Sequence, residues 1–391
     1  MAHIELFNIS IQGLLFIPVI SLVLILIYFR NKLYILDGYF TAIDSKFSTN
    51  FQKALLYFLF TSFAIFIGFL ICTITFPYSD IDNAMQGAIQ AFFINGINPY
   101  ANNVVPHIFI NSQTTNIIYG TYNYGPIDLL CYGIGFFIFY PFFGPGWWLY
   151  VSNIVLILLI YVIIRKIIQI PETIKFIPFI LLSSLFMQDN TVLMVFFLAI
   201  AWAIHEKINN KSKYPLVTIF LTIGVFSKLF LLFTLFGYFA IVFRSNIKLW
   251  VQNGLISLGV AILIIFPFGY KDVINSIFIF HVDLSLRKSF AIIQGGIPLY
   301  LDIFHLDWLF IPLAFTLTGV FIVISDKYVP DQLKLKISIF SILNLVLLPS
   351  SEYAFFFIPG LLLLLQYYEN HLDKYNKSVY VGQNQFIKTI P

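Results

Sequence analysis

Two carboxylates separated by one residue, Asp80 and Asp82, stand where a long apolar stretch gives way to polar sequence. In an extended chain alternate side chains share a face, so both carboxylates can converge on one site. Such a pair can take the proton of an attacking hydroxyl, or hold a divalent cation such as Mg²⁺ or Mn²⁺ through oxygen ligands. The alternative is structural, with Asp80 capping the helix that follows and Asp82 a solvated acid in its first turn.

Three cations are candidates for binding a phosphate. Arg287 can grip a phosphate through two parallel hydrogen bonds, and Lys288 follows it directly. Both can equally contact anionic lipid headgroups. Lys228 lies among apolar residues, where an ionisable side chain is either functional or extends to the membrane surface.

Five further side chains are candidates for substrate binding: Tyr122, Tyr124, Asp189, His281 and Glu352. The two tyrosines are typical of a membrane interface as well as of stacking on a substrate. Asp189 either caps a helix or contacts the acidic pair. His281 is more typical of an interface than of catalysis, and Glu352 either binds the donor sugar or pairs with a cation.

The composition indicates what kind of protein positions these residues. The 391 residues are 60% hydrophobic and only 10% charged, with a mean hydropathy of +0.90. Soluble domains carry about 25% charged residues, so this chain has too few for a water-facing surface. The composition predicts a multi-pass integral membrane protein and gives no support to nucleic-acid binding. The two cysteines, Cys72 and Cys131, lie in apolar runs and suggest neither a disulfide framework nor a metal site.

The fold class predicted is all-α, a polytopic transmembrane helical bundle of about eleven spans. Each span needs about 20 mostly apolar residues, and helices are expected because every backbone group must be satisfied within the lipid. The expected spans are roughly 9–29, 54–77, 146–164, 174–188, 191–205, 214–228, 229–243, 249–268, 306–325, 333–349 and 353–368.

One apolar stretch, 125–143, is expected to lie in the outer membrane interface rather than to span. If it does not span, 18 of the 22 Lys and Arg fall in cytoplasmic loops; if it does, only 8 fall inside. Positive residues prefer the cytoplasmic side, so the first arrangement is favoured. It leaves two long outer segments, 78–145 and 269–305, and function is sought there because long ordered loops are usually functional.

Short motifs in the outer segments follow a definite order along the chain. The motifs are Asp80-Ile81-Asp82, an amphipathic helix over 84–95, Gly96-Ile97-Asn98-Pro99-Tyr100, Thr121-Tyr122-Asn123-Tyr124-Gly125-Pro126, Gln188-Asp189-Asn190, the segment 280–290 and Ser350-Ser351-Glu352-Tyr353. Their order and sidedness resemble the first mannosyltransferase of GPI-anchor assembly and, more broadly, the GT-C superfamily of polyprenol- or dolichol-phosphate-sugar-dependent glycosyltransferases. The resemblance covers about 54–368 and departs from the family at Lys288, Ser289 and Glu352, which bears on the acceptor.

The resemblance implies three regions: an extra span and linker at 1–53, a GT-C-like catalytic domain at 54–368 with juxtamembrane helices in its first long loop, and a cytoplasmic tail at 369–391. It implies inverting transfer of a hexose, mannose by analogy, from a polyprenyl-phosphate donor to a glycolipid or glycan acceptor. Asp80 or Asp82 would be the base, and Arg287 would bind the lipid phosphate, with Lys288 and Lys228 as further phosphate ligands. The expected location is the plasma membrane, with an extracytoplasmic active site and a small accessory subunit as a potential partner.

Two other functions stay open from the residues alone. A secondary transporter or flippase for a lipid-linked or small polar substrate would use charged residues within the membrane, and Lys228 is the best feature in its favour. If the protein is instead a structural subunit of a glycosylation complex, its acidic residues are not expected to come together at one site.

Overall fold

The computed structural model describes residues 80–111, 114–167, 190–279 and 332–346, with isolated residues between 309 and 366. Expected spans 9–29, 54–77 and 174–188 lie outside the described residues, and 306–325 and 353–368 are described only at isolated positions. The described elements are α4 (Asp80–Ile89), η2 (Gln90–Ile94), β1 (Val105–Asn111), β2 (Thr114–Gly120), α5 (Pro126–Phe143), α6 (Trp147–Ile167), α8 (Thr191–Lys207), α9 (Lys213–Val225), α10 (Leu231–Val242), α11 (Ile247–Ile265), η3 (Phe266–Phe268), α12 (Tyr270–Val273), η4 (Ile274–Ile279) and α17 (Leu333–Val346).

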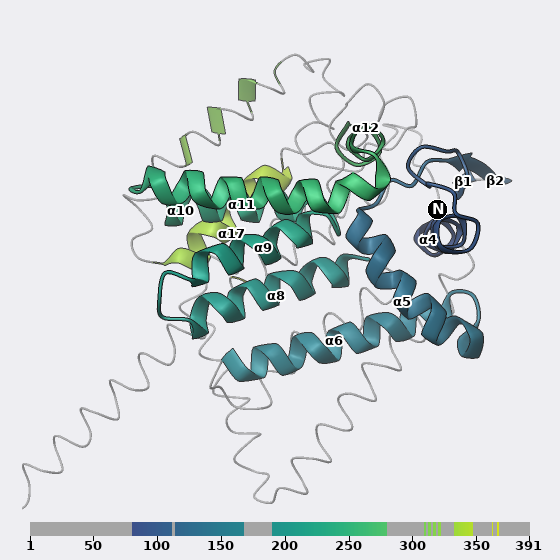
Figure 1. Cartoon of the computed structure of the whole chain (residues 1–391), viewed down its shortest axis with the longest axis horizontal. Helices are drawn as coiled ribbons and strands as arrows, with labels where there is room; N and C mark the ends of the chain where they lie inside the picture. Colours follow the sequence, from purple (N-terminus) through teal and green to yellow (C-terminus); the bar gives the residue numbers. More distant parts are fainter. Residues whose placement is uncertain are drawn as a thin grey trace, which may run out of the picture.

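Helices α6, α8, α9 and α11 lie side by side with similar axes (Figure 1), and successive members are in contact. Helix α10 packs on α9, and α17 packs on α10. Short turns reverse the chain after α8, α9 and α10. We call the end where α8 begins and α9 ends the hairpin end, because β1 and β2 lie there (Figure 1). The opposite end, where α8 ends and α9 begins, is called the basic end.

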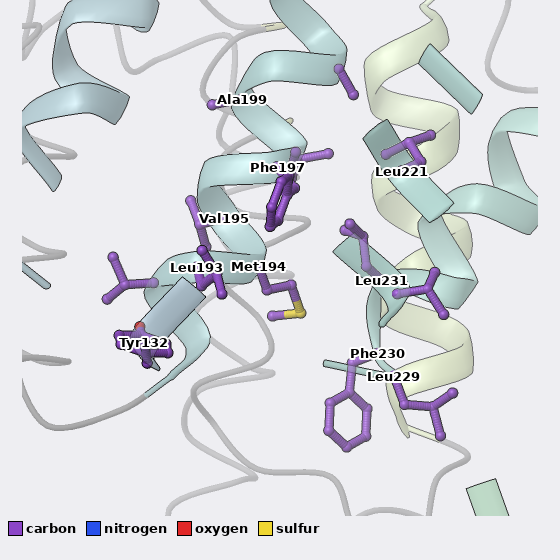
Figure 2. Packing of buried hydrophobic residues seen from close by; sticks show 14 of the residues in the cluster. Tyr132, Leu193, Met194, Val195, Phe197, Ala199, Leu221, Leu229, Phe230 and Leu231 are labelled. Atoms are coloured by element: carbon purple, nitrogen blue, oxygen red, sulfur yellow. The ribbon is translucent and has the colours of Figure 1, made fainter. Parts of the chain in front are cut away.

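Helix α8 forms the centre of the hydrophobic core. Most of its residues from Thr191 to Trp202 are buried, and Figure 2 shows its side chains packed between α5 and the α9–α10 pair. At Gly224 in α9 a Cβ would lie 2.3 Å from Leu231 and 3.0 Å from Phe197, so α8, α9 and α10 meet closely there. A helix that is apolar on all sides, as α8 is, is expected to be buried.

The described part of the chain is mostly helical, and three helices are long and apolar enough to cross a membrane: 126–143, 147–164 and 247–268. The expected spans 146–164, 191–205, 229–243 and 249–268 are confirmed as helices, with ends shifted by a few residues, and 333–349 is helical over its described part, 333–346. The span expected at 214–228 is too long. Its helix ends at Val225, so Lys228 lies in the turn that follows.

A β-hairpin is the element that the all-helical prediction missed. Strands β1 and β2 pair antiparallel from Val105 opposite Gly120 to Asn111 opposite Thr114. Both strands are rich in β-branched and aromatic residues, which favour a pleated strand. The argument that only helices satisfy the backbone holds within lipid, and it does not apply to a hairpin that packs on α4 at the end of the bundle.

The long loop before the first bundle helix is built from α4, the hairpin and α5. The amphipathic helix expected at 84–95 is present as α4 and η2, and Gly96, with φ +66°, ends it. Helix α5 begins at Pro126, which has the fixed φ suited to a first helical position. Both ends of α5 lie at the hairpin end, because its start contacts the turn after α9 and its end leads through 144–146 into α6. It therefore crosses the end of the bundle obliquely (Figure 1).

Candidate functional site

Charge is divided unequally between the two ends of the bundle. Only Lys228 and Lys271 of the eleven described Lys and Arg residues are at the hairpin end. The other nine are at the basic end: Arg165, Lys166, Lys207, Lys211, Lys213, Arg244, Lys248, Lys334 and Lys336. The described acids show the reverse distribution, with Asp80, Asp82, Asp128 and Asp272 at the hairpin end and Glu206 at the other. Chemistry that uses a carboxylate is therefore sought at the hairpin end.

Lys228 is the buried cation of the hairpin end, with 7% of its surface exposed. It lies in the turn between α9 and α10, and its Nζ donates hydrogen bonds to Asn190 Oδ1 at 2.7 Å and to Thr191 Oγ1 at 2.9 Å. Both acceptors belong to the start of α8. A buried ammonium is costly unless it is hydrogen-bonded, and these contacts hold it against the first turn of that helix.

Asn190 connects this lysine to a buried acid. Its Nδ2 donates to Asp128 Oδ2 at 2.5 Å, while its Oδ1 accepts from Lys228. Asp128 is fully buried in the first turn of α5, where the positive end of the helix dipole favours a negative charge. Asp128, Asn190 and Lys228, which we call the buried network, thus join the starts of α5 and α8 to the turn after α9.

The start of α5 fits closely against that turn. Ile127 N donates to Phe226 O at 3.0 Å, and Gly125 N donates to Ser227 O at 3.3 Å. A Cβ at Gly125 would lie 1.8 Å from Phe226 O, so only glycine allows this approach. The motif Gly125-Pro126 therefore positions Asp128 next to the residues that hold Lys228.

Three tyrosines pack beside the buried network. The rings of Tyr100 and Tyr122 lie 5.6 Å apart, those of Tyr122 and Tyr124 lie 5.4 Å apart, and Tyr100 Oη donates to Tyr124 O. Burial, and to a smaller extent the charge of Asp128, hold the pKa values of Tyr100 and Tyr122 well above the usual range, so both phenols stay neutral. The described residues offer no hydrogen-bond partner to the Tyr122 hydroxyl or to Asn123 Oδ1. Both atoms are buried, and Tyr124 is the partly exposed ring of the three.

Asp82 is buried at a different place, with 1% of its surface exposed. Burial raises its pKa from 3.8 to about 6, and the Trp148 indole and the Gly146 backbone N–H, which face the carboxylate, act in the opposite direction. A carboxylate with a pKa close to neutrality is typical of a catalytic acid or base. The interpretation of Asp82 as a solvated first-turn acid is therefore wrong.

Asp82 and the buried network lie near opposite ends of α5. Helix α4 contacts the end of α5, because Gln86 Nε2 donates to Tyr140 Oη at 3.3 Å and Asp82 faces Gly146 beyond it. The helical rise separates Asp128 from Tyr140 by about 18 Å. Of the predicted site residues, the structure therefore brings together Lys228, Tyr122 and Tyr124, and it does not bring Asp82 to them.

The remaining predicted site residues are Asp189, His281, Arg287, Lys288 and Glu352, and they lie outside the described residues, as does the side chain of Asp80. Within the described part of the chain no three His, Cys, Asp or Glu side chains gather as they would around a metal ion. The groups identified at Asp82 are N–H donors, which do not bind cations. The side chain of Asp80 lies outside the described residues, so the Mg²⁺ or Mn²⁺ site that the acidic pair suggested stays a prediction.

Sequence reasoning missed four residues of the site: Tyr100, Asp128, Asn190 and Thr191. Asp128 and Asn190 both lie at the start of an apolar helix on the expected outer side. A polar residue at such a position is usually interpreted as a helix cap. Their pairing joins positions 62 residues apart. Comparison of the chain with family models, curated proteins and solved structures found no match.

Proposed function

We propose that this protein is an inverting glycosyltransferase that moves a hexose from a polyprenyl-phosphate donor to a glycolipid or glycan acceptor at the outer membrane face. The order of motifs resembling the GT-C superfamily supports the reaction class. The observation that carries the proposal is Asp82, a buried carboxylate with a pKa of about 6 at the acidic end of a helical bundle. A general base works best when its pKa lies near the operating pH.

In this reaction the acceptor hydroxyl attacks the anomeric carbon while the bond from that carbon to the lipid phosphate breaks. Asp82, or Asp80, takes the hydroxyl proton, and the lipid phosphate leaves with the bonding electrons. A cation beside the phosphate lowers the barrier as negative charge grows on it. Arg287 and Lys288 are the candidates for this role.

Lys228 has a different role in this proposal. Its distance from Asp82 along α5 means that both cannot act on one glycosidic bond. Its contacts with Asn190 and Thr191 instead keep the starts of α5 and α8 in place beside Tyr122 and Tyr124. Tyr122 is fully buried, so the partly exposed Tyr124 is the residue of this pair that the acceptor or the lipid part of the donor can contact.

The proposed orientation follows from the charges. The basic end faces the cytoplasm because positive residues are retained there, so the hairpin end is extracytoplasmic. Helix α5 has both ends at the hairpin end, which supports a position along the outer interface. A plasma-membrane location and the full number of about eleven spans are part of the same proposal.

A secondary transporter or flippase is the second candidate, because the Asp128–Asn190–Lys228 network is a buried ionisable cluster. Transporters place such groups near the bilayer midplane. Lys228 instead lies in a turn at the end of two helices, which favours the transferase. Counterflow of a labelled polar substrate in proteoliposomes would support transport.

The experiment that tests the proposal compares Asp80→Asn and Asp82→Asn with the wild type in sugar transfer. Each change keeps the side chain's size and removes the base, so at least one of them should lower transfer by about 10²-fold or more. Asp272→Asn removes an acid from the same end and is the control, with transfer expected to persist. Unchanged transfer in both Asp80→Asn and Asp82→Asn would exclude the assigned roles.

A further inference from the structure

A polar cavity of about 250 Å³ lies at the basic end of the bundle, opposite the candidate site. The last turns of α8, the loop to α9 and the first turns of α9 and α17 surround it. Its lining is Trp202, His205, Glu206, Asn209, Lys213 and Lys334, together with Leu333. No step of the proposed sugar transfer uses this cavity.

The cavity carries a net positive charge. Lys334 Nζ lies 2.7 Å from Glu206 Oε1, so that carboxylate offsets one of the two lining lysines. Glu206 is the only acid of the described residues at the basic end, whereas nine Lys and Arg are there. Lys213 therefore leaves the cavity cationic, and the surrounding side chains strengthen the positive potential.

The lining groups are held in place before any ligand binds. Lys334 is 7% exposed and its Nζ lies 5.8 Å from the centre of the Trp202 ring. The His205 ring stacks on Trp202 with 5.2 Å between centroids, and its Nδ1 is 3.0 Å from Tyr238 Oη. Lys213 Nζ donates to His205 O at 3.5 Å. Preorganised donors lose less entropy on binding an anion than mobile surface lysines do.

We propose that this cavity binds a phosphate group. Two lysine ammonium groups and the exposed Asn209 amide are suitable donors for phosphate oxygens. Basic pockets between helices at the cytoplasmic boundary are suited to the headgroups of anionic lipids. The same chemistry would bind a soluble phosphate compound, and the experiment distinguishes the two sources.

The test uses the purified, delipidated full-length protein and follows its thermal unfolding with two probes, inorganic phosphate and short-chain phosphatidylglycerol. A ligand that binds only the folded state raises the unfolding midpoint, and the rise grows with the logarithm of the ligand concentration once that concentration exceeds Kd. Short-chain phosphatidylcholine, which has no net charge, controls for detergent effects. We expect Lys213→Gln to weaken binding about tenfold, the effect of losing one charged hydrogen bond.

Two further variants make the test specific. Glu206→Gln removes the carboxylate that competes for Lys334, so it should tighten binding. Lys248→Gln removes an exposed lysine at the same end but outside the cavity, so it should change binding less than twofold. Lys213→Gln is thus expected to weaken phosphate binding and Glu206→Gln to tighten it. A general loss of stability would not produce these opposite effects.

Binding of inorganic phosphate with this pattern of variants would show that the phosphate group alone is recognised. Binding of phosphatidylglycerol alone with the same pattern would assign the cavity to a lipid headgroup. Equal weakening by Lys213→Gln and Lys248→Gln would indicate diffuse surface charge and overturn the proposal. Failure of both probes to raise the unfolding midpoint would also overturn it, whatever the outcome for sugar transfer.

Discussion

At the scale of single residues, Asp82 combines burial with a position at the acidic end of the bundle. Its pKa is about 6 in the folded protein and 3.8 as a free side chain, so the folded state binds the proton more tightly. Its contribution to stability is therefore most favourable below about pH 4 and is lost as the pH rises through about 6. The folded protein tolerates this cost at neutral pH, as is common for catalytic groups.

Asp82→Asn should therefore raise the free energy of unfolding at pH 7.5, by up to about 3 kcal/mol for a shift of two pKa units. The gain should shrink as the pH falls towards 4. Unfolding in mixed micelles at several pH values, followed by circular dichroism, measures both effects. Asp272→Asn should change stability by less than about 0.5 kcal/mol. A destabilised Asp82→Asn variant at pH 7.5 would contradict the assigned environment.

The buried network makes a second prediction at this scale. Lys228→Met leaves Asp128 and Asn190 without their cation, which should cost about 3 kcal/mol. Asp128→Asn should cost a comparable amount. The double variant removes both charges, so its loss should be smaller than the sum by more than about 0.5 kcal/mol. Additive losses in the double-mutant cycle would show that the two residues are not coupled through Asn190.

The sequence indicates Lys228 by itself but not the residues that hold it. A charged side chain in an apolar run stands out because burying it is costly. Asp128, Asn190 and Thr191 each stand at a helix start, where a polar residue is ordinary. Their significance depends on how α5, α8 and α9 pack, and packing between distant segments is not encoded in local spacing.

At the scale of elements, the fit of α5 against the turn after α9 positions the candidate site. Gly125 is the residue on which this fit depends, because a Cβ there would lie 1.8 Å from Phe226 O. The predicted boundaries of α5, 125–143, agree with the helix found at 126–143. Gly125 and Pro126 before the helix and Gly144 after it mark those boundaries locally.

Gly125→Ala should lower the free energy of unfolding by about 2 kcal/mol or more, because backbone atoms cannot yield to the added methyl group. Gly259→Ala is the matched control. Gly259 lies within α11 with no atom within 4 Å of its added Cβ, and replacing a helical glycine by alanine should stabilise by about 0.5–1 kcal/mol. Chemical unfolding of the two variants measures the difference. Equal effects would contradict the close approach of α5.

The hairpin shows where reasoning from periodicity was incomplete at this scale. The high hydropathy led to the expectation of helices throughout, yet β1 and β2 form a local antiparallel pair. Their β-branched residues were a usable signal. In the described part of the chain the helix ends were predicted within a few residues, except at 226–228, where apolar residues continue beyond the last helical turn of α9.

At the scale of the whole molecule, the unequal charge of the two ends sets the expected orientation. We expect Asn102→Cys, at an exposed position of the hairpin end, to react with a membrane-impermeant maleimide in intact cells. Ser245→Cys, exposed at the basic end, should react only after permeabilisation. Both variants are made with Cys72 and Cys131 replaced by alanine. The reverse labelling pattern would contradict the proposed orientation and the extracytoplasmic site.

The proposed reaction consumes a polyprenyl-phosphate sugar. Its most direct test incubates the purified protein in liposomes with a panel of polyprenyl-phosphate hexoses and a membrane glycolipid extract as acceptor, and measures released polyprenyl phosphate. We predict release from one donor, mannosyl by analogy, which increases as the pH rises through about 6 and is lost in at least one of Asp82→Asn and Asp80→Asn. Absence of release from every donor, or equal release by wild type, Asp80→Asn and Asp82→Asn, would overturn the proposal.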